Sequence, residues 1–514
     1  MSNGAFAAAM AVLPDYLGQH VLLSVSALLL GIAISLPLAI VSAQSRSLRE
    51  PVLALANIVQ TIPGLALLAL FYPVLLALSV FTARAFGLRI PALGFLPALL
   101  ALTLYSMLPV LRNTIAALMG LDPAVKTAAR AVGMTPRQSL LIVELPLAAP
   151  VIMAGIRIAA VWVIGTATLS TPVGQTSLGN YIFTGLQTEN WIFVLFGCVA
   201  AGALALVIDR LLALAETGFA QRSRARLIAA FIGVVVVIAA SLVPLIGTAS
   251  GRAVIGAKNF EEQYILSAVI ADQLAKAGVP SIRRSDLGST IIFRALVAGD
   301  VDAYVDYSGT IWANEMHRHD MPGRAAVLQQ VARWLKTTYG ILDVGSLGFE
   351  NAYVLAMRRD KAKALDIETL ADLAAYAPRM KIGGDYEFFS RPEWASIVKT
   401  YRMHFAVQRS YQPTFMYRAL SDGDVDVISA FSSDGRIAEY HLKLLSDPKS
   451  ALPPYDAVLL LSPKRAQDAK FFAALKPLAG RIDLTTMQRA NLMVDRDKRT
   501  PEDVAKWLVQ RIRK

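Results

Sequence analysis

The chain has 514 residues, of which 55% are hydrophobic and 17% charged, and it contains one cysteine. Its charge is uneven: 20 of the first 250 residues are charged, or 8%, against 68 of the remaining 264, or 26%. A soluble domain is about 25% charged, so only the second half has an ordinary composition. These values exclude a purely soluble protein, a disordered chain and a disulfide scaffold. Because the second half mixes both signs of charge, nucleic acid is not an expected partner.

Long runs without charge predict about six membrane-spanning helices in the first half. A helix rises about 1.5 Å per residue, so roughly 20 residues cross the hydrocarbon layer of a lipid bilayer. The segments that meet this length are residues 16–43, 52–80, 91–119, 147–170, 191–214 and 227–248. The fourth carries Arg157 in its interior.

Basic residues predict how these spans are oriented. They gather after the first, third and fifth spans, at Arg46, Arg49, Lys126, Arg130, Arg137, Arg222, Arg224 and Arg226. Loops rich in Lys and Arg face the cytoplasm. We therefore expect a multi-pass protein of the cell (inner) membrane, with its C-terminal half on the extracytoplasmic, or periplasmic, side and the sixth span as its tether.

The longest cytoplasmic loop, residues 126–146, has features of a docking element. Small side chains at Ala128 and Ala129 suit a helix that approaches another surface closely, and Gly133 is expected to end that helix. Thr135 followed by Pro136 is expected to begin the next one. The sequence contains no G-x-x-x-x-G-K-[ST] motif, so ATP-driven work would need a separate subunit.

This loop resembles the coupling loop of ABC-importer permeases, in its two alanines, the glycine and the run Val143-Glu-Leu-Pro146. The resemblance implies that Ala128, Ala129, Gly133 and Pro146 contact a separate cytoplasmic ABC ATPase subunit. It also implies a homodimer of the membrane half around one path. Thr127 replaces the glutamate that usually precedes the two alanines.

The second half alternates short apolar strands with helical stretches, a pattern typical of α/β folds. Within it, residues 293–302 return as residues 417–426, and the extended repeat has eight identities in 17 aligned positions. The same offset of 124 pairs Tyr307 with Phe431. Ligands of α/β proteins lie beyond the carboxyl ends of strands, so these rings are expected to face each other across a cleft. The alternative is that both rings are core packing.

Twelve of the 16 tyrosines lie in this half. A quaternary ammonium has no N–H to donate, so aromatic faces recognise it instead. Tyr353 and Tyr455 each precede an apolar strand, where crossovers between two lobes are expected. A carboxylate at the other end of a ligand would need fixed positive charge, for which Arg391 and Lys258 are candidates unless they are ordinary surface residues.

Several motifs resemble the substrate-binding domain of glycine betaine/choline-type importers. They are Lys258-Asn-Phe-x-Glu-Gln263, Gly299-Asp-x-Asp302, Asp306-Tyr-Ser-Gly-Thr310, Asn351-Ala-Tyr353, Ala430-Phe-Ser-Ser-Asp-Gly-Arg-Ile437 and Pro453-Pro-Tyr-Asp-Ala457. The resemblance implies a bilobal, type II (venus-flytrap) fold of the periplasmic binding proteins. It also implies a cage of Tyr307, Tyr353, Phe431 and Tyr455, with Lys258, Thr310 and Arg391 near the acid group of the ligand.

The expected architecture is a multidomain chain with an all-α permease bundle followed by an α/β binding domain. Its parts are the permease at 1–226, the sixth span and linker at 227–251, and the binding domain at 252–514. Lobe 1 is expected at about 252–350 and 456–514, and lobe 2 at about 351–455.

The expected function is that of the permease and substrate-binding subunit of an ABC importer for a quaternary ammonium compound such as glycine betaine, choline, carnitine or ergothioneine. No enzymatic activity, cofactor or metal site is expected, and His317 and His319 are interpreted as solvated side chains. The alternatives are an importer for an unrelated amino acid, a membrane-tethered solute sensor and a cell-wall enzyme. A sensor would need a cytoplasmic output domain, for which the loops are too short.

Overall fold

The computed structural model describes residues 2–87, 90–188, 190–243, 252–318, 320, 322–385 and 388–512. These residues form two compact units, one built mainly from the first half of the chain and the other mainly from residue 252 onward, with Thr184–Trp191 grouped with the second. The boundary agrees with the change in charge along the sequence.

The first unit is helical throughout its described ranges. Its elements are α1 (Ser2–Gln44), α2 (Arg46–Thr61), α3 (Gly64–Phe86), α4 (Phe95–Met119), α5 (Pro123–Ala131), α6 (Pro136–Gln138), η1 (Ser139–Glu144), α7 (Leu145–Ala167), η2 (Thr168–Val173), α8 (Gly179–Gln187), α9 (Trp191–Ala220) and α10 (Arg224–Leu242). Six stretches are long and apolar enough to cross a membrane: Ala9–Gln44, Gly64–Phe86, Phe95–Met119, Pro136–Val173, Trp191–Ala220 and Arg224–Leu242. This confirms the predicted number of spans.

The second span begins later than predicted. The expected segment 52–80 is broken at Ile62 and Pro63, because a residue before proline is disfavoured in the helical region and Ile62 is extended, with φ −73° and ψ 127°. The preceding residues form the separate helix α2, which carries an exposed ion pair between Arg46 and Glu50. The span itself is α3.

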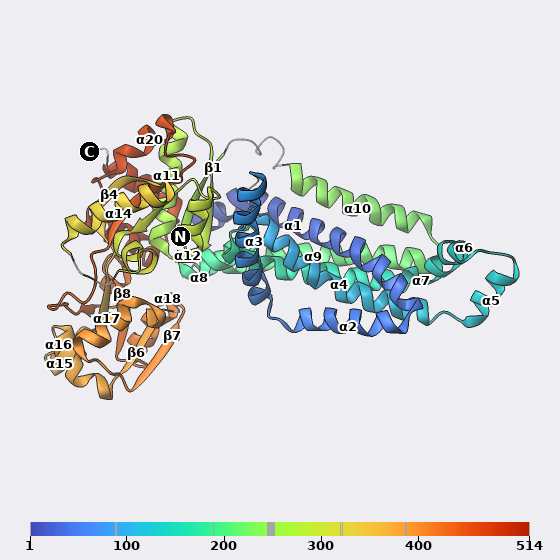
Figure 1. Cartoon of the computed structure of the whole chain (residues 1–514), viewed down its shortest axis with the longest axis horizontal. Helices are drawn as coiled ribbons and strands as arrows, with labels where there is room; N and C mark the ends of the chain where they lie inside the picture. Colours follow the sequence, from blue (N-terminus) through green and yellow to red (C-terminus); the bar gives the residue numbers. More distant parts are fainter. Residues whose placement is uncertain are drawn as a thin grey trace. The chain divides into compact units, whose positions relative to one another are not determined.

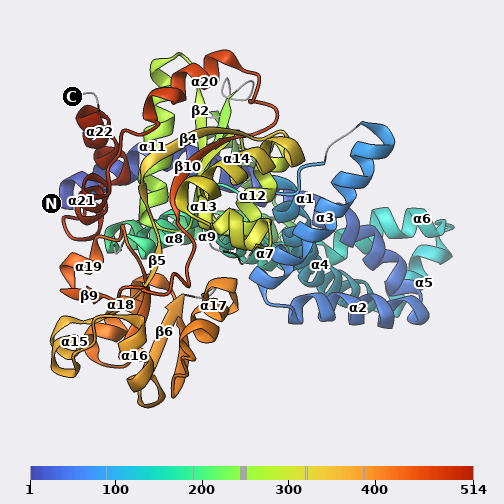
Figure 2. The ribbon, with the colours of Figure 1, turned by 60° about the vertical axis from the view of Figure 1, so that its left-hand side comes forward.

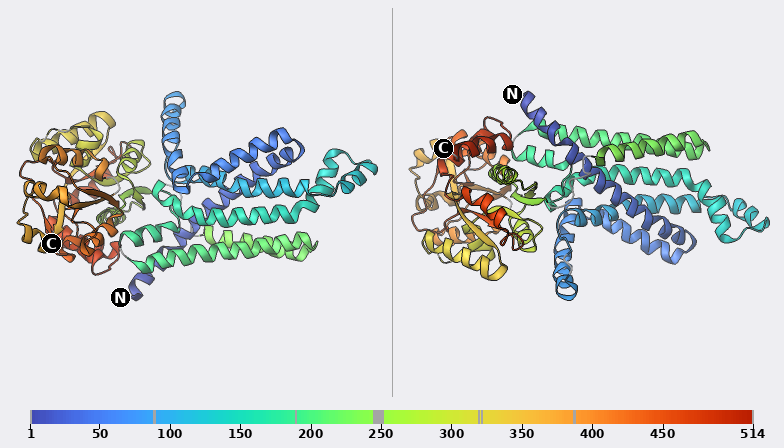
Figure 3. Two further views of the ribbon diagram at one scale, coloured as in Figure 1. Left: turned by 90° about the horizontal axis from the view of Figure 1, so that it is seen from below. Right: turned by 90° about the horizontal axis from the view of Figure 1, so that it is seen from above.

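The centre of this unit is α4, which packs against α1 and α7 (Figure 1). Small side chains such as Ala98 and Ala101 are fully buried there and allow the helices to approach closely. Figure 3 shows the long helices lying side by side, with α3 turned away from them. The short elements α5 and α6 lie at one end of the bundle.

The second unit contains two mixed five-stranded sheets (Figure 2). Their strands are β1 (Ala253–Lys258), β2 (Ser281–Leu287), β3 (Ala303–Tyr307), β4 (Leu342–Glu350), β5 (Tyr353–Arg358), β6 (Lys381–Asp385), β7 (Val407–Tyr411), β8 (Val427–Phe431), β9 (Leu442–Leu444) and β10 (Asp456–Leu461). The sheet of order β2-β1-β3-β10-β4 is the centre of the first lobe, and the sheet of order β7-β6-β8-β5-β9 is the centre of the second. The predicted α/β fold with two lobes is confirmed.

Helices cover both sheets. They are α11 (Glu261–Lys276), α12 (Ser289–Ala298), α13 (Ser308–Thr310), η4 (Ile311–Glu315), α14 (Arg324–Tyr339), α15 (Arg359–Leu365), α16 (Leu370–Tyr376), η5 (Ala377–Arg379), η6 (Phe388–Ser390), α17 (Pro392–Tyr401), α18 (Pro413–Asp422), α19 (Arg436–Glu439), α20 (Ala469–Leu475), η7 (Lys476–Leu478), α21 (Leu484–Asp495) and α22 (Pro501–Ile512). The chain passes from the first sheet to the second between β4 and β5 and returns between β9 and β10. After β10 it stays with the first lobe, where α21 and α22 pack on α11.

The internal repeat is also a structural repeat. Helix α12 and strand β3 have bounds that shift by 124 residues to those of α18 and β8. In each copy the last aspartate of the repeated sequence accepts a hydrogen bond from the backbone of the neighbouring strand. Asp302 Oδ2 accepts a hydrogen bond from the Val254 amide at 2.8 Å, and Asp426 Oδ2 accepts one from the Lys381 amide at 2.7 Å. Both lobes therefore contain the same helix–turn–strand unit, in which an aspartate precedes the strand and an aromatic residue ends it.

Candidate binding site

Five aromatic rings meet where the chain crosses between the lobes. Tyr307 and Phe431 end β3 and β8, and the ring of Phe260 is stacked on both. Its centroid lies 6.2 Å from that of Tyr307 and 5.8 Å from that of Phe431. The Tyr353 ring lies 4.6 Å from Phe431 and 5.8 Å from Tyr455. The structure thus brings the four predicted cage rings into one cluster, together with a fifth that the sequence reasoning missed.

Arg391 lies beside this cluster, as an ion partner for an acid group would. It is 9% exposed, its guanidinium carbon is 5.4 Å from the Tyr353 ring centroid, and Nη2 donates to Ser289 Oγ of the first lobe at 3.2 Å. Glu393 is close to it at 3.7 Å and accepts a hydrogen bond from the Tyr455 hydroxyl at 2.5 Å. Burial and this carboxylate raise the pKa of Tyr455 well above its ordinary range, so the phenol stays protonated and donates.

Lys258 is already paired inside the first lobe. Its ammonium Nζ lies 2.5 Å from Asp306 Oδ1, both side chains are almost fully buried, and Nζ is 5.2 Å from the Tyr307 ring centroid. The side chain therefore supports the Tyr307 ring and its charge is largely neutralised by Asp306. Thr310 is also buried, in the short helix α13 that follows Tyr307.

Glu262 holds the Tyr307 ring in place. Its Oε1 accepts hydrogen bonds from the Tyr307 hydroxyl at 2.6 Å and from Asn351 Nδ2 at 3.0 Å, and its Oε2 accepts one from Asn491 Nδ2 at 3.0 Å. Burial raises the pKa of the Glu262 carboxyl, and these donors partly offset the increase. The motif Lys258-Asn-Phe-x-Glu-Gln263 contained this residue, but no pattern in the sequence indicated its partners.

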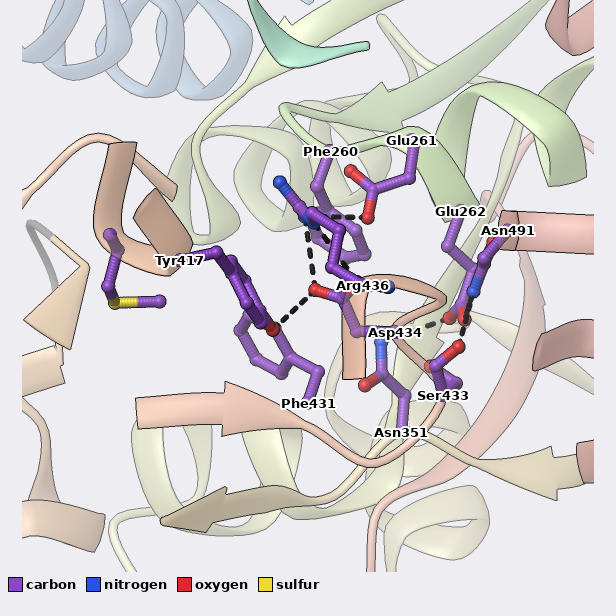
Figure 4. Close-up of a pocket in the computed structure, with 11 residues that line it drawn as sticks. Phe260, Glu261, Glu262, Asn351, Tyr417, Phe431, Ser433, Asp434, Arg436 and Asn491 are labelled. Atoms are coloured by element: carbon purple, nitrogen blue, oxygen red, sulfur yellow. Dashed lines mark hydrogen bonds and ion pairs between the residues drawn. The ribbon is translucent and has the colours of Figure 1, made fainter. Parts of the chain in front are cut away.

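Two cavities of very different size lie beside the rings. A small cavity of about 10 Å³ lies against Phe260 and Phe431 and is otherwise lined mainly by polar groups (Figure 4). That volume holds at most one water molecule. A wider hollow of about 490 Å³ is lined by Tyr353 and by residues from both lobes near the crossovers, including Arg324, Glu350 and Asp447. The rings are therefore packed on one another, and the small cavity lies beside them.

Three carboxylates near the small cavity could hold a cation by their spacing. Their oxygens, from Glu261, Asp434 and Asp495, all lie within 4.8 Å of one another. The guanidinium of Arg436 already lies among them, and Figure 4 shows it beside Glu261 and Asp434. This cluster is therefore an internal ion network in the structure. His317 is exposed, and His319 lies outside the described residues.

The loop at 126–146 folds as its sequence indicates. Gly133 has a positive φ of +81° after α5, and Thr135 caps the next helix by a reciprocal pair of hydrogen bonds with Gln138, with Pro136 in the first turn. Ala128 is exposed and Ala129 is buried. Glu144, two residues before the predicted motif residue Pro146, lies 3.5 Å from Lys126 Nζ, so the two ends of the loop are joined by an ion pair.

The charge inside the fourth span has partners that the sequence reasoning did not identify. Arg157 of α7 forms a bidentate pair with Asp209 of α9, at 2.5 and 3.0 Å, and contacts Glu216 at 3.3 Å. Both partners lie near the end of the fifth span. Pairing offsets the cost of placing an arginine within a membrane-spanning helix.

Each half of the chain matches a known protein family. Residues 251–511 match the substrate binding domain of ABC-type glycine betaine transport systems, and residues 35–246 match the inner membrane component of binding-protein-dependent transport systems. Among curated relatives, the ergothioneine transport permease/ergothioneine binding protein EgtU of Helicobacter pylori is 29% identical over 483 residues, or 90% of this chain and 84% of EgtU. The choline transport system permease protein OpuBB of Bacillus subtilis is 39% identical over 198 residues, or 38% of this chain and 84% of OpuBB.

Among solved structures, a glycine betaine/carnitine/choline ABC transporter has 27% sequence identity and a TM-score of 0.44, and the match covers 50% of this chain and 97% of that one. The two family matches together span most of the chain, one on each side of the change in charge. The chain belongs to the ABC importers of the glycine betaine type, in which it is a permease fused to its substrate-binding domain.

Proposed function

We propose that the second unit captures a quaternary ammonium compound between its lobes and that the first unit carries this compound across the membrane. The observation that supports the ligand class is the cluster of rings from both lobes at the crossovers. Each desolvated ring face contributes up to about 2 kcal/mol to binding a cation without N–H groups. Tyr307, Tyr353, Phe431 and Tyr455 are the proposed cage.

Arg391 is the proposed partner for the acid group of a betaine. It is nearly buried, lies against the Tyr353 ring and already reaches across to Ser289 of the other lobe. Lys258 and Thr310 are proposed to act from the first lobe, and Lys258 does so mainly through its pair with Asp306. Glycine betaine, carnitine and ergothioneine carry both a trimethylammonium and a carboxylate, whereas choline would leave Arg391 without an anionic partner.

The first unit is proposed to work as a homodimer on a separate cytoplasmic ATPase, which ABC permeases require. Ala128, Ala129, Gly133 and Pro146 are the proposed contacts with that ATPase. Pro146 also lines a surface groove of about 810 Å³ beside Leu141, Ile142 and Phe219. Both Leu141 and Ile142 are more than 60% exposed, so this end of the unit offers apolar surface to a partner.

The domain limits and the orientation are part of the proposal. We place the permease at 1–226, the sixth span with its linker at 227–251, and the binding domain at 252–514, with lobes at about 252–350 plus 456–514 and about 351–455. The basic loops support a periplasmic or other extracytoplasmic position for the binding domain.

A second candidate, an importer for an unrelated amino acid, is favoured by the amides and acids around the small cavity. Those groups are, however, bonded to one another. Asn491 Nδ2, for example, donates to both Glu262 and the carbonyl of Ser433. They support the rings and leave few donors for a ligand, so the aromatic cage is the better explanation of the site.

Equilibrium binding to the full chain in lipid nanodiscs tests the ligand class. We expect at least one of glycine betaine, choline, carnitine and ergothioneine to bind. Glycine, which differs from glycine betaine only by three methyl groups, is the matched control and is expected not to bind. Failure of all four compounds to bind would overturn the proposed ligand class and leave the family assignment intact.

A further inference from the structure

The loop after β8 extends from the second lobe into the first. Asn491 of α21 donates to the Ser433 carbonyl at 2.7 Å, and Gln488 of the same helix donates to the Ser432 carbonyl at 3.0 Å. A Cβ atom on Gly435 would lie 2.5 Å from the Leu492 backbone nitrogen, so the two backbones are in direct contact. The loop and α21 thus form an interlobe contact that excludes any side chain at position 435.

Arg436 places its guanidinium at the centre of this contact (Figure 4). Nη2 lies 2.7 Å from Glu261 Oε1 of the first lobe and 3.0 Å from Asp434 Oδ2 of its own loop, and Nε is 3.9 Å from Asp495 Oδ2. The guanidinium carbon is 4.5 Å from the Tyr417 ring centroid. All four charged side chains are at most 4% exposed. One cation therefore faces three buried carboxylates, two of them from the other lobe.

This network is continuous with the ring cluster. Glu261 lies between Phe260, which is stacked between the two lobes, and Glu262, which holds Tyr307. At the other end, the loop that carries Arg436 begins directly after Phe431. The network is therefore assembled only when Phe431 is in place against Phe260, which is also the arrangement that closes the cage.

We propose that Arg436 and the carboxylates of Glu261, Asp434 and Asp495 form a latch that takes up a proton as the lobes close, so that ligand capture is coupled to pH. This inference rests on the proposed binding of a ligand between the lobes. Glu261 Oε2 and Asp495 Oδ2 accept no hydrogen bond from the residues that the structure describes. One oxygen of each carboxylate lies within 4.8 Å of the others, so a proton on either group relieves their mutual repulsion.

The groups that face this network come from both lobes. Glu261, Glu262, Asp495 and Lys498 belong to the first lobe, and Tyr417, Asp434 and Arg436 belong to the second. The Tyr417 hydroxyl donates to Asp434 Oδ2 at 2.5 Å, so Asp434 is satisfied by a donor that Glu261 and Asp495 lack. The proton is therefore expected on Glu261 or Asp495, which titrate as one unit.

The direction of the pH effect follows from linkage. Burial, opposed by Arg436, raises the pKa of Glu261 from 4.5 to about 7 and that of Asp495 well above its ordinary value. In the separated lobes these carboxyls regain water and lower pKa values. Closure then binds a proton between about pH 4.5 and about pH 7, and ligand affinity falls by up to about tenfold per pH unit across that window. Above it, the affinity levels off.

The test measures binding of choline and glycine betaine to the full chain in nanodiscs between about pH 5 and about pH 8. Glu261→Gln keeps the shape and removes the titrating group, and Asp495→Asn does the same at the second position. We expect wild-type affinity to fall with rising pH and the dependence to flatten in at least one of these variants. Asp286→Asn is the matched control. Burial also raises the pKa of Asp286 to about 7, but this residue is bonded to Tyr264 within the first lobe, so the variant should retain the wild-type dependence.

A readout of closure separates this inference from the ligand assignment. Spin labels at exposed sites on α14 and α16 report the distance between the lobes without ligand. The latch is supported if the fraction of molecules with closed lobes rises as the pH falls and this rise disappears in Glu261→Gln or Asp495→Asn. That result supports it even if neither choline nor glycine betaine binds. A wild-type chain whose binding and interlobe distance are both independent of pH would overturn it, as would a dependence that persists in the Glu261→Gln/Asp495→Asn double variant.

Discussion

Tyr353→Ala is expected to weaken the binding of a quaternary ammonium ligand roughly 30-fold or more. The Tyr353 ring is the only one in the described cluster in contact with Phe431, Tyr455 and the guanidinium of Arg391 together. A desolvated cation–π contact contributes about 2 kcal/mol, and about 1.4 kcal/mol corresponds to tenfold in affinity. Equilibrium binding to the full chain measures the loss.

Two controls make the Tyr353 result specific. Tyr353→Phe keeps the ring face and is expected to bind within a few-fold of wild type. Tyr376→Ala truncates a tyrosine that is 37% exposed on the second lobe and should leave binding unchanged. Equal losses in Tyr353→Ala and Tyr353→Phe would show that the hydroxyl matters more than the ring, contrary to the proposed cage.

Asp209→Leu is expected to destabilise the membrane unit by about 3 kcal/mol or more. Without Asp209 the guanidinium of Arg157 keeps, among the described residues, the ion pair with Glu216 at 3.3 Å to compensate a charge within a membrane-spanning helix. Breaking one side of such a pair is more damaging than removing both charges. Thermal unfolding of the full chain in detergent measures the change.

The double variant Arg157→Leu/Asp209→Leu is the matched control for this pair. It removes both charges and leaves an apolar contact between α7 and α9, so we expect it to recover most of the lost stability. A double variant as unstable as Asp209→Leu would mean that the pair does more than neutralise a charge within a membrane-spanning helix. An unaltered Asp209→Leu protein would show that the pair contributes nothing to stability.

The sequence predicted the fold where local chemistry decides it. Long apolar runs predicted the six spans, and the internal repeat predicted two strands that end at Tyr307 and Phe431. The predicted second span was wrong at Pro63. There the backbone preference of the residue before proline interrupts the continuous apolar run and separates α2 from α3. The fourth span also runs beyond the predicted 147–170, over Pro136–Val173. The acids that pair with its Arg157 lie on another helix, and a window of sequence cannot show such long-range partners.

The sequence predicted most of the residues in the ring cluster, but it did not predict which of them contact one another. The four predicted rings lie in recognisable motifs, and the structure brings them together beside Arg391. Phe260 was missed because its position at the start of α11 indicates nothing about the ring that it meets in the other lobe. Likewise, the pairing of Lys258 with Asp306 joins residues that are 48 positions apart. Such pairs depend on the strand order of the sheet, which sequence periodicity does not specify.

The central claim is that aromatic faces from two lobes enclose a permanent positive charge. The most direct measurement compares the binding of choline with that of its uncharged carbon isostere, in which a tert-butyl group replaces the trimethylammonium. The two molecules have nearly the same shape, so their difference reports the charge alone. We predict that choline binds at least about tenfold more tightly to the full chain. Equal binding of the two compounds would contradict the cation cage.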